Sequence, residues 1–169
     1  MASVTVRPAG GDDAAAVQAI LDREIREGVA HFSTVPPTVG EVAVSIAETG
    51  RHPFRVGVVD GAVVGFARTT PWKPREAYAW SAEVGVYVAP GYHRTGVGRA
   101  LVGEVLAAAT GAGLRTFLAG IALPNPASVA LFEGFGFAAA GVFPSIGFKH
   151  GRWWDVGYWS LAVGAGDPR

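Results

Sequence analysis

Hydrophobic and polar positions follow two different periods along this chain, and they predict a mixture of strands and helices. Apolar runs of strand length recur at residues 4–8, 54–59, 63–67, 82–89, 116–122, 137–146 and 153–162. Apolar residues at helical spacing fill four other segments, at residues 13–28, 38–50, 96–112 and 125–136. Because strands outnumber helices and only part of the chain alternates strand with helix, we expect an α/β (α+β) fold with a mixed sheet rather than a doubly wound one.

Local signals mark several ends of these elements. Thr38 and Glu41 form a capping-box pattern at the start of a helix. Asp60-Gly61 lies between two apolar runs and predicts the turn of a hairpin. Asn125-Pro126 fits a helix N-cap followed by proline at the first helical position, and Gly136 is expected to end that helix.

The segment Tyr92–Leu101, YHRTGVGRAL, is a glycine-rich turn that follows the apolar run Val84–Ala89 and opens onto an amphipathic helix. Such a turn leaves backbone N–H groups at the positive end of the helix dipole, where they can bind a phosphate or pyrophosphate. Gly96 and Gly98 have no Cβ, so an anion can approach the main chain closely. On the glycines alone, a plain strand-to-helix turn explains the pattern equally well.

Composition narrows the class of protein. The 169 residues suit one domain; 50% are apolar and 17% charged, which excludes a disordered chain. Lys plus Arg equals Asp plus Glu at 14 each, which argues against a nucleic-acid-binding protein. The absence of cysteine excludes thiol nucleophiles and disulfides, and the four histidines lack metal-type spacing. With neither a signal peptide nor a membrane-spanning stretch in the sequence, we expect a cytoplasmic protein without metal or membrane partner.

In order, these elements resemble the GNAT superfamily of acyl-CoA-dependent N-acetyltransferases, over roughly residues 4–161. Three stretches, PWKPREAYAWSAEVGVYV (Pro71–Val88), LPNPASVALFEGFGF (Leu123–Phe137) and GFKHGRWWDVGYW (Gly147–Trp159), are similar to phosphinothricin or methionine sulfoximine N-acetyltransferases. The resemblance implies a single GNAT domain over residues 1–169, with a mixed, mostly antiparallel sheet of six or seven strands and about four helices. It also implies acetyl-CoA as co-substrate, a small amine as acceptor, and a homodimer. A dinucleotide site is not expected, because the turn lies mid-chain and lacks a GxGxxG run.

The resemblance also implies which residues hold the cofactor. The turn would bind the coenzyme A pyrophosphate, and the main chain of the preceding strand would pair with the pantetheine arm and aim an N–H at the thioester carbonyl. Arg94 and Arg99 would add charge-assisted bonds, or be solvated surface charges. Asn125 would contact the cofactor, or only cap its helix. The cofactor-binding residues so implied are Val86, Tyr87, Val88, Arg94, Thr95, Gly96, Val97, Gly98, Arg99 and Asn125.

Glu83 is the candidate catalytic base. An amine must lose a proton before it attacks a thioester, and a carboxylate whose pKa is raised by burial can accept that proton. Glu83 falls in an otherwise apolar strand and aligns with the base proposed for the family. A structural ion pair is the alternative.

The acceptor pocket should combine cations for a carboxylate with aromatic walls. Lys73 and Arg75, beside Trp72, are similar to the family's carboxylate-binding loop, although either cation could instead be solvated. Phe32 and Trp153 are expected to close the pocket. For Trp80 and Trp159 we expect core packing instead.

Two positions depart from the family pattern. His93 stands where Arg or Gln usually begins the signature, and Arg94 beside it can compensate. Phe132 stands where relatives place Tyr or His to protonate the leaving thiolate, so solvent or another hydroxyl, such as that of Tyr87, must do so. Two alternatives to the amino-acid acetyltransferase stay open: acetylation of a different primary amine and, because of Phe132, a non-catalytic acyl-CoA-binding module.

Overall fold

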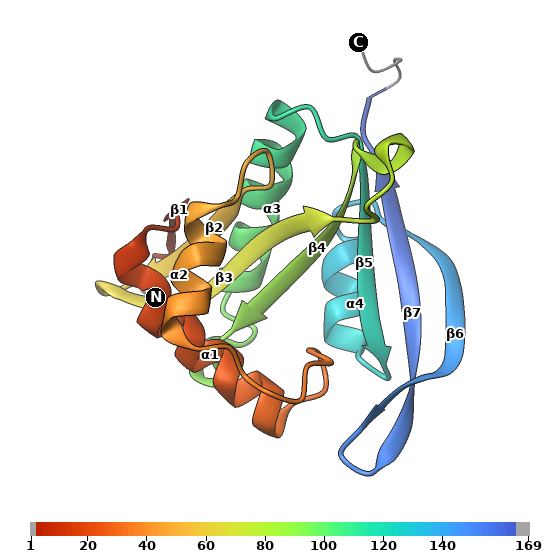
Figure 1. The fold of residues 1–169 in the computed structure, drawn as a ribbon, viewed down its shortest axis with the longest axis horizontal. Helices are drawn as coiled ribbons and strands as arrows, with labels where there is room; N and C mark the ends of the chain where they lie inside the picture. The colour runs from red at the N-terminus through yellow and green to blue at the C-terminus, as the bar shows by residue number, and fades with distance from the viewer. Residues whose placement is uncertain (1–2, 165–169) are drawn as a thin grey trace.

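The computed structural model describes residues 3–164. One sheet of seven strands runs through the molecule in the order β1-β2-β3-β4-β5-β7-β6, and only the neighbours β4 and β5 are parallel. The strands are β1 (Thr5–Pro8), β2 (Phe54–Val59), β3 (Ala62–Pro71), β4 (Ser81–Val88), β5 (Thr116–Leu123), β6 (Ala138–Lys149) and β7 (Arg152–Ala162). The mixed, mostly antiparallel sheet expected from the sequence is confirmed (Figure 1).

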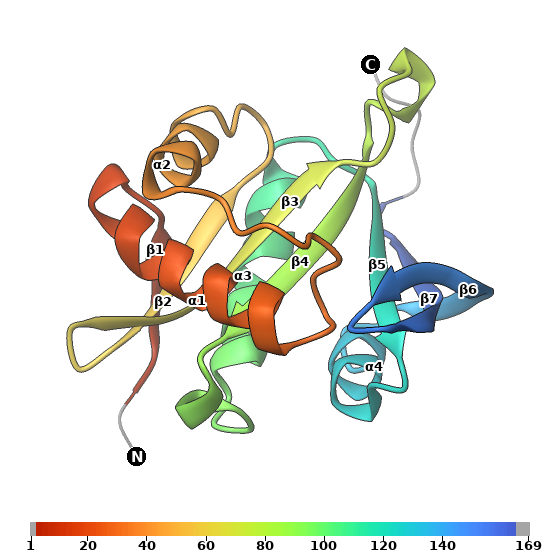
Figure 2. The same cartoon turned by 60° about the horizontal axis from the view of Figure 1, so that its bottom comes forward.

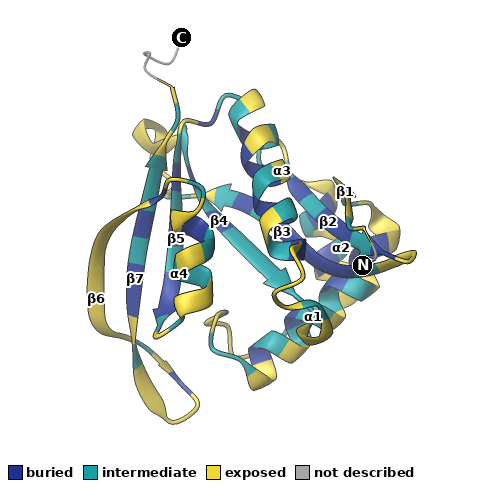
Figure 3. Ribbon diagram, turned by 180° about the vertical axis from the view of Figure 1, so that it is seen from behind, coloured by how far each residue is buried: buried dark blue, intermediate teal, exposed yellow. Residues whose placement is uncertain are grey.

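Four α-helices cover the two faces of this sheet. They are α1 (Ala14–Glu27), α2 (Val39–Ala47), α3 (Val97–Gly111) and α4 (Pro126–Glu133), with short 3-10 turns η1 (Gly11–Asp13), η2 (Glu76–Tyr78) and η3 (Pro90–Tyr92). Helices α1 and α2 lie on one face and α3 on the other (Figure 2). Figure 3 shows the molecule from behind, with α3 and α4 in view. Within residues 3–164, no helix is both long and apolar enough to cross a membrane.

Each face has its own apolar core, built by the amphipathic patterns of the sequence. The α1–α2 face packs Val17, Leu21 and Ile25 against Phe54 and Phe66. The opposite face is larger and buries the apolar stripe of α3 with residues of β4, β5 and α4. Phe66 and Phe117, the largest fully buried side chains, lie in different clusters, so each face is anchored by its own aromatic residue.

The signals at the helix starts are confirmed. The Thr38 hydroxyl accepts the N–H of Glu41, whose carboxylate in turn accepts the N–H of Thr38. The Asn125 side chain accepts the N–H of Ser128, with proline at the next position. Asp13 occupies the N-cap of α1 without capping it, because its carboxylate binds Arg7 and the Gly10 N–H.

Four predicted ends were wrong. Helix α2 ends at Ala47 rather than near Gly50. The strand expected to stop at residue 67 runs on to Pro71, because β4 continues to pair with it as far as Ala82. The strand expected to stop at residue 146 runs to Lys149, because pairing with β7 resumes after a bulge. Helix α4 ends at Glu133 rather than near Gly136, so Phe135 lies beyond it, in a tight turn.

Candidate active site

The site lies where the two parallel strands part. Strand β4 pairs with β5 only over Ser81–Glu83 and Thr116–Leu118. Beyond that point the strands diverge (Figure 1), so the edge of β4 from Val84 to Val88 has no partner strand on the β5 side. An unpaired strand edge offers free N–H and C=O groups to an extended ligand.

A cavity and a groove occupy this opening and join each other. The cavity, about 440 Å³, lies beside Glu83 and Tyr158, whereas the groove, about 1250 Å³, runs from the middle of β4 to the start of α3. Both are lined by the same five residues at their junction, Ala30, Val86, Tyr87, Asn125 and Ser128. A long molecule in the groove can therefore place one end in the cavity.

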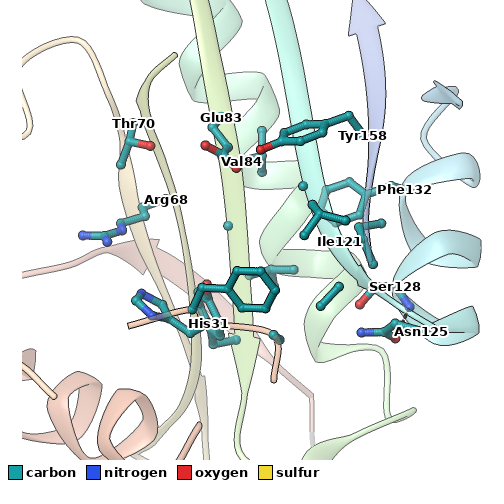
Figure 4. A pocket seen from close by; sticks show the side chains of 18 of the residues that line it. His31, Arg68, Thr70, Glu83, Val84, Ile121, Asn125, Ser128, Phe132 and Tyr158 are labelled. Carbon is teal, nitrogen blue, oxygen red and sulfur yellow. Dashed lines mark hydrogen bonds between the residues drawn. The ribbon is translucent and has the colours of Figure 1, made fainter. Parts of the chain in front are cut away.

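Glu83 is the carboxylate that lines the cavity, at the last residue of β4 that pairs with β5. It is half-buried, and burial raises its pKa above the ordinary value of 4.5, while the positive charge of Lys73 opposes that rise. On β5, Gly120 makes room for it: a Cβ at Gly120 would lie only 3.0 Å from Glu83 Oε1 and 3.1 Å from the Tyr158 ring. Figure 4 shows Tyr158 extending from its strand toward Glu83. Burial and the charge of Glu83 together raise the pKa of the Tyr158 hydroxyl, which keeps it protonated near neutral pH.

The other end of the groove is the glycine-rich turn before α3. Gly96 adopts φ +93°, and a Cβ there would meet open space, so the turn faces the groove as a backbone surface. The first backbone bond of the helix runs from the Ala100 N–H to the Gly96 carbonyl, and the preceding amides have no acceptor within the helix. His93 Nε2 lies 2.8 Å from the Val88 carbonyl oxygen and ties the turn to the end of β4. The turn therefore has the features of an anion site.

Most of the predicted cofactor-binding residues lie along this groove. Its lining includes Val86, Tyr87, Val88, Arg94, Gly96, Gly98, Arg99 and Asn125. Thr95 and Val97 do not line it with their side chains, because the Thr95 hydroxyl binds the Tyr92 carbonyl and Val97 is buried in the core. Arg99 lies with its guanidinium 5.2 Å from the centre of the Phe135 ring.

Of the residues predicted to bind the acceptor, only one lines the cavity. Phe32 lines the cavity, but Trp72, Lys73, Arg75 and Trp153 are not part of its lining. Trp72 packs edge-on against Tyr158, with ring centroids 5.4 Å apart, and Lys73 Nζ lies 5.1 Å from the Trp72 ring. Through these contacts, the loop of Trp72 and Lys73 lies next to the cavity.

Trp153 lies on the outer part of the hairpin. It is 60% exposed and packs against Phe148. Of the two tryptophans expected in the core, Trp159 is buried and Trp80 is half-buried.

The hairpin of β6 and β7 holds the loop that carries Phe32. Lys149 Nζ, at the end of β6, is buried and donates to the His31 carbonyl at 2.7 Å. His150 Nε2 lies 2.9 Å from the Gly28 carbonyl oxygen. A Cβ at Gly147 would overlap the Phe32 ring, so this ring lies directly against the hairpin backbone. The hairpin thereby holds the loop whose residues Ala30, His31 and Phe32 line the cavity.

A sequence model of the Acetyltransferase (GNAT) family matches residues 19–137. This chain belongs to that family. Phosphinothricin N-acetyltransferase of Streptomyces viridochromogenes is 39% identical over 157 residues, covering 92% of this chain and 86% of the relative. The L-methionine sulfoximine/L-methionine sulfone acetyltransferase of Pseudomonas aeruginosa is 28% identical, with 94% of each chain covered.

Solved structures of this GNAT family agree with the fold. A phosphinothricin acetyltransferase from Sinorhizobium meliloti, in complex with acetyl-CoA, superposes with a TM-score of 0.91 at 32% identity, covering 95% of this chain and 89% of that one. A Salmonella typhimurium protein solved with its cofactor acetyl-CoA superposes with a TM-score of 0.95 at 25% identity, covering 99% and 98%. The single-domain GNAT fold predicted from the sequence is confirmed, and the protein is an acetyltransferase.

Phe132 stands where the resemblance to the family implies Tyr or His. It lines the cavity from α4, is 4% exposed, and packs edge-on against Phe137 with ring centroids 5.1 Å apart. Tyr87, one of the alternative proton donors, stacks on Phe66 with centroids 5.2 Å apart. Deep burial raises the pKa of its hydroxyl strongly, so Tyr87 is a poor acid in this position.

Several residues of the cavity were not predicted from the sequence. Arg68 and Thr70 line it from β3, His31 from the loop after α1, Ser128 from α4 and Tyr158 from β7. Arg68 and Thr70 are spaced two residues apart in the sequence, and their pairing with Gly85 and Glu83 places them on the same face as Glu83. They were missed because the strand was expected to end before them. Among residues 3–164, no cluster of three or more His, Cys, Asp or Glu side chains could hold a metal ion.

Proposed function

We propose that this GNAT enzyme transfers an acetyl group from acetyl-CoA to the α-amine of a small amino-acid-like acceptor, of the phosphinothricin or methionine sulfoximine type. One observation carries the proposal: the carboxylate of Glu83, with its raised pKa, lines a cavity that joins the groove along β4. The relatives named for these two acceptors cover most of the chain.

The groove fits an acyl-coenzyme A. Its open backbone surface at Gly96 suits a diphosphate, and Arg94 and Arg99 line the same end. The unpaired edge of β4 suits the amides of a pantetheine arm, which can bind as a short extra strand. Acetyl-CoA supplies an acetyl group that is activated as a thioester.

The residues of the cavity then serve the attack of the amine. The carboxylate of Glu83 accepts the proton that the acceptor's ammonium must lose, directly or through water, and its raised pKa suits this role. The neutral amine adds to the thioester carbon, the carbon–sulfur bond breaks, and coenzyme A leaves as a thiolate. The new amide nitrogen gives up its surplus proton to solvent, and the thiolate takes a proton from solvent. A main-chain N–H of Val86, Tyr87 or Val88 stabilises the negative charge that develops on the carbonyl oxygen.

Lys73 and Arg75 are proposed to bind the acceptor's α-carboxylate. Lys73 is close enough to Glu83 to lower its pKa, so an anion held there would lie near the amine. Both residues are exposed on the loop beside the cavity, where an arriving substrate can reach them.

A panel of amines tests the proposal, with release of free coenzyme A thiol as the measurement. We expect phosphinothricin, methionine sulfoximine or methionine sulfone to be acetylated, and Glu83→Gln to reduce kcat on the order of a hundredfold. Glu133→Gln is the matched control, since that carboxylate is exposed and accepts the Trp159 indole N–H outside the cavity. Consumption of polyamines or peptides but none of the amino-acid analogues would contradict the acceptor class.

Retained activity after Lys73→Ala and Arg75→Ala would favour acetylation of a different primary amine. Calorimetric binding of acetyl-CoA without turnover on any acceptor would instead identify a non-catalytic binding module.

We also propose that the enzyme is a homodimer, with the β6–β7 hairpin in the interface. Strand β6 forms an edge of the sheet and is exposed along most of its length (Figure 3). Large apolar side chains lie exposed there: Val142, Phe143, Ile146, Phe148 and Trp153. Exposed apolar patches of this kind favour association. Light scattering tests the proposed dimer. We expect the mass of a dimer for the wild type and the mass of a monomer for Phe143→Glu.

A further inference from the structure

Arg68 is a cation that lines the acceptor cavity itself, unlike Lys73 and Arg75, which lie on the loop beside it. It lies on β3, in register with Gly85 of β4, while the neighbouring pair on the same face is Thr70 with Glu83. Arg68 is therefore the diagonal neighbour of Glu83, at a backbone separation of about 7–8 Å. Gly85 has no side chain, and a Cβ there would meet only the Tyr87 ring, so the space between Arg68 and the cavity stays open.

The charge of Arg68 has no carboxylate partner within residues 3–164: the salt bridges in this range join Arg7 to Asp13, Arg23 to Glu27 and Arg26 to Asp22. Its one side-chain acceptor in that range is the Ser45 hydroxyl, which Nη1 contacts at 3.0 Å. The guanidinium carbon also lies 5.8 Å from the centre of the Phe54 ring. Neither a hydroxyl nor a ring supplies a counter-charge, so this half-buried arginine is able to bind an anionic ligand.

The nearby carboxylates are engaged elsewhere. Glu41 lines the hollow next to Arg68, and its carboxylate accepts the N–H and hydroxyl of Thr38. Glu24 accepts the Ala30 N–H at 2.8 Å. Glu83 is the proposed base, and the charge of Lys73 lowers its pKa.

The positive charge of Arg68 does reach the cavity. Burial, followed by the charges of Arg68 and Lys149, lowers the pKa of His31, which keeps this side chain neutral. Arg68 and His31 together form the wall between the cavity and a second hollow of about 370 Å³ under α2. Figure 4 shows Arg68, Thr70 and His31 on one side of Glu83, opposite Ile121 and Phe132.

We propose that Arg68 binds a second anionic group, carried on the side chain of the acceptor, so that the preferred substrate is a dianionic amino acid. This rests on the proposed function, with Lys73 and Arg75 at the α-carboxylate. The side-chain anion, a phosphinate or a second carboxylate, reaches Arg68 and Thr70 across the open space above Gly85. A neutral side chain leaves this guanidinium without a counter-charge and is the poorer substrate.

Two acceptors make a matched pair for the test. Phosphinothricin and methionine sulfone both place a tetrahedral, methyl-bearing centre two methylene groups beyond the α-carbon, but only the phosphinate is charged. The quantity to measure is the ratio of kcat/KM for phosphinothricin to that for methionine sulfone. We expect Arg68→Gln to lower this ratio on the order of tenfold or more. Arg68→Lys should lower the ratio less, because it keeps the positive charge.

Arg55→Gln is the control, because Arg55 lies on the adjacent strand β2 and lines a different hollow, away from the cavity. It should keep the wild-type ratio. A ratio that Arg68→Gln leaves unchanged, with or without an equal loss on both acceptors, would overturn the inference.

Calorimetry gives the ratio of the dissociation constants of the two compounds, and this measurement needs no turnover. If the wild type acetylates neither compound, the proposed function fails. The effect of Arg68→Gln on binding of the two compounds still decides the role of this residue.

Discussion

The carboxylate of Glu83 lies against the backbone of Gly120, on the strand that runs parallel to its own. A Cβ at Gly120 would approach Glu83 Oε1 to 3.0 Å and the Tyr158 ring to 3.1 Å. Strands β4 and β5 stop pairing at this level. Because Gly120 has no side chain, the Glu83 carboxylate fits into the opening between the two strands. The position of the proposed base therefore depends on a residue without a side chain.

Gly120→Ala tests this dependence. The added methyl group pushes the carboxylate or the Tyr158 ring away, and a displaced base transfers protons less well, so we expect kcat to fall on the order of tenfold or more. Gly11→Ala is the control, because a Cβ there meets open space in η1. An alanine variant with wild-type kcat would show that the carboxylate does not need its present position.

The pH dependence should follow the charge next to Glu83. Burial raises the pKa of this carboxyl, and the base works only when deprotonated, so kcat should rise with pH through a pKa above 4.5. Lys73 holds that pKa down, and Lys73→Met should therefore move the acid limb of the kcat profile to higher pH. Lys73→Arg keeps the charge and should leave the limb in place. A shift to lower pH in the methionine variant would contradict the assignment.

Phe132 offers a gain-of-function test. If the leaving thiolate departs beside α4, Phe132→Tyr places a proton donor at a position that now has none, and kcat should rise severalfold. The rise should be largest when chemistry limits turnover, which single-turnover kinetics would establish. Phe137→Tyr is a matched control, since Phe137 packs on Phe132 but does not line the cavity. An unchanged single-turnover rate would show that protonation of the thiolate does not limit the reaction.

Asp13 is expected to stabilise the fold rather than the site. It accepts two bonds from Arg7, at 2.7 and 2.8 Å, and one from the Gly10 N–H, and these bonds join β1 to the start of α1. Asp13→Asn should cost about 1–2 kcal/mol of unfolding free energy, reduced because Arg7 is partly exposed. Denaturant unfolding at neutral pH measures this difference.

The acid dependence of that difference follows from the pKa. The Arg7 hydrogen bond lowers the pKa of Asp13 below 3.8 in the folded state. Its contribution is therefore complete above pH 3.8 and is lost as pH falls through the folded-state pKa. The wild type and Asp13→Asn should converge in stability over that acid range. A gap that stays constant would contradict the linkage.

Much of the fold could be predicted because its determinants are local. The hairpin at Asp60-Gly61, the capping box at Thr38 and the Asn125 cap depend on neighbouring residues, and all three are confirmed. Strand ends were harder, since the end of β3 is set by pairing with β4 and the end of β6 by a bulge against β7.

The site was predictable where one segment forms it and less so where several strands meet. The turn at Gly96 belongs to one continuous stretch, and the structure places it at the end of the groove. Arg68 and Gly120 approach Glu83 only through the order of strands in the sheet, which no local pattern encodes. Trp153 was expected to close the cavity from its place in a similar segment, but it packs on Phe148 of the same hairpin and is exposed.

A crystal structure with coenzyme A and an N-acetylated amino acid would test the central claim most directly. We predict the diphosphate on the amides of residues 94–99 and the sulfur in the opening between β4 and β5. The nitrogen of the product should lie within direct or one-water reach of the Glu83 carboxylate. A coenzyme bound elsewhere, or a product whose nitrogen lies away from Glu83, would contradict the account.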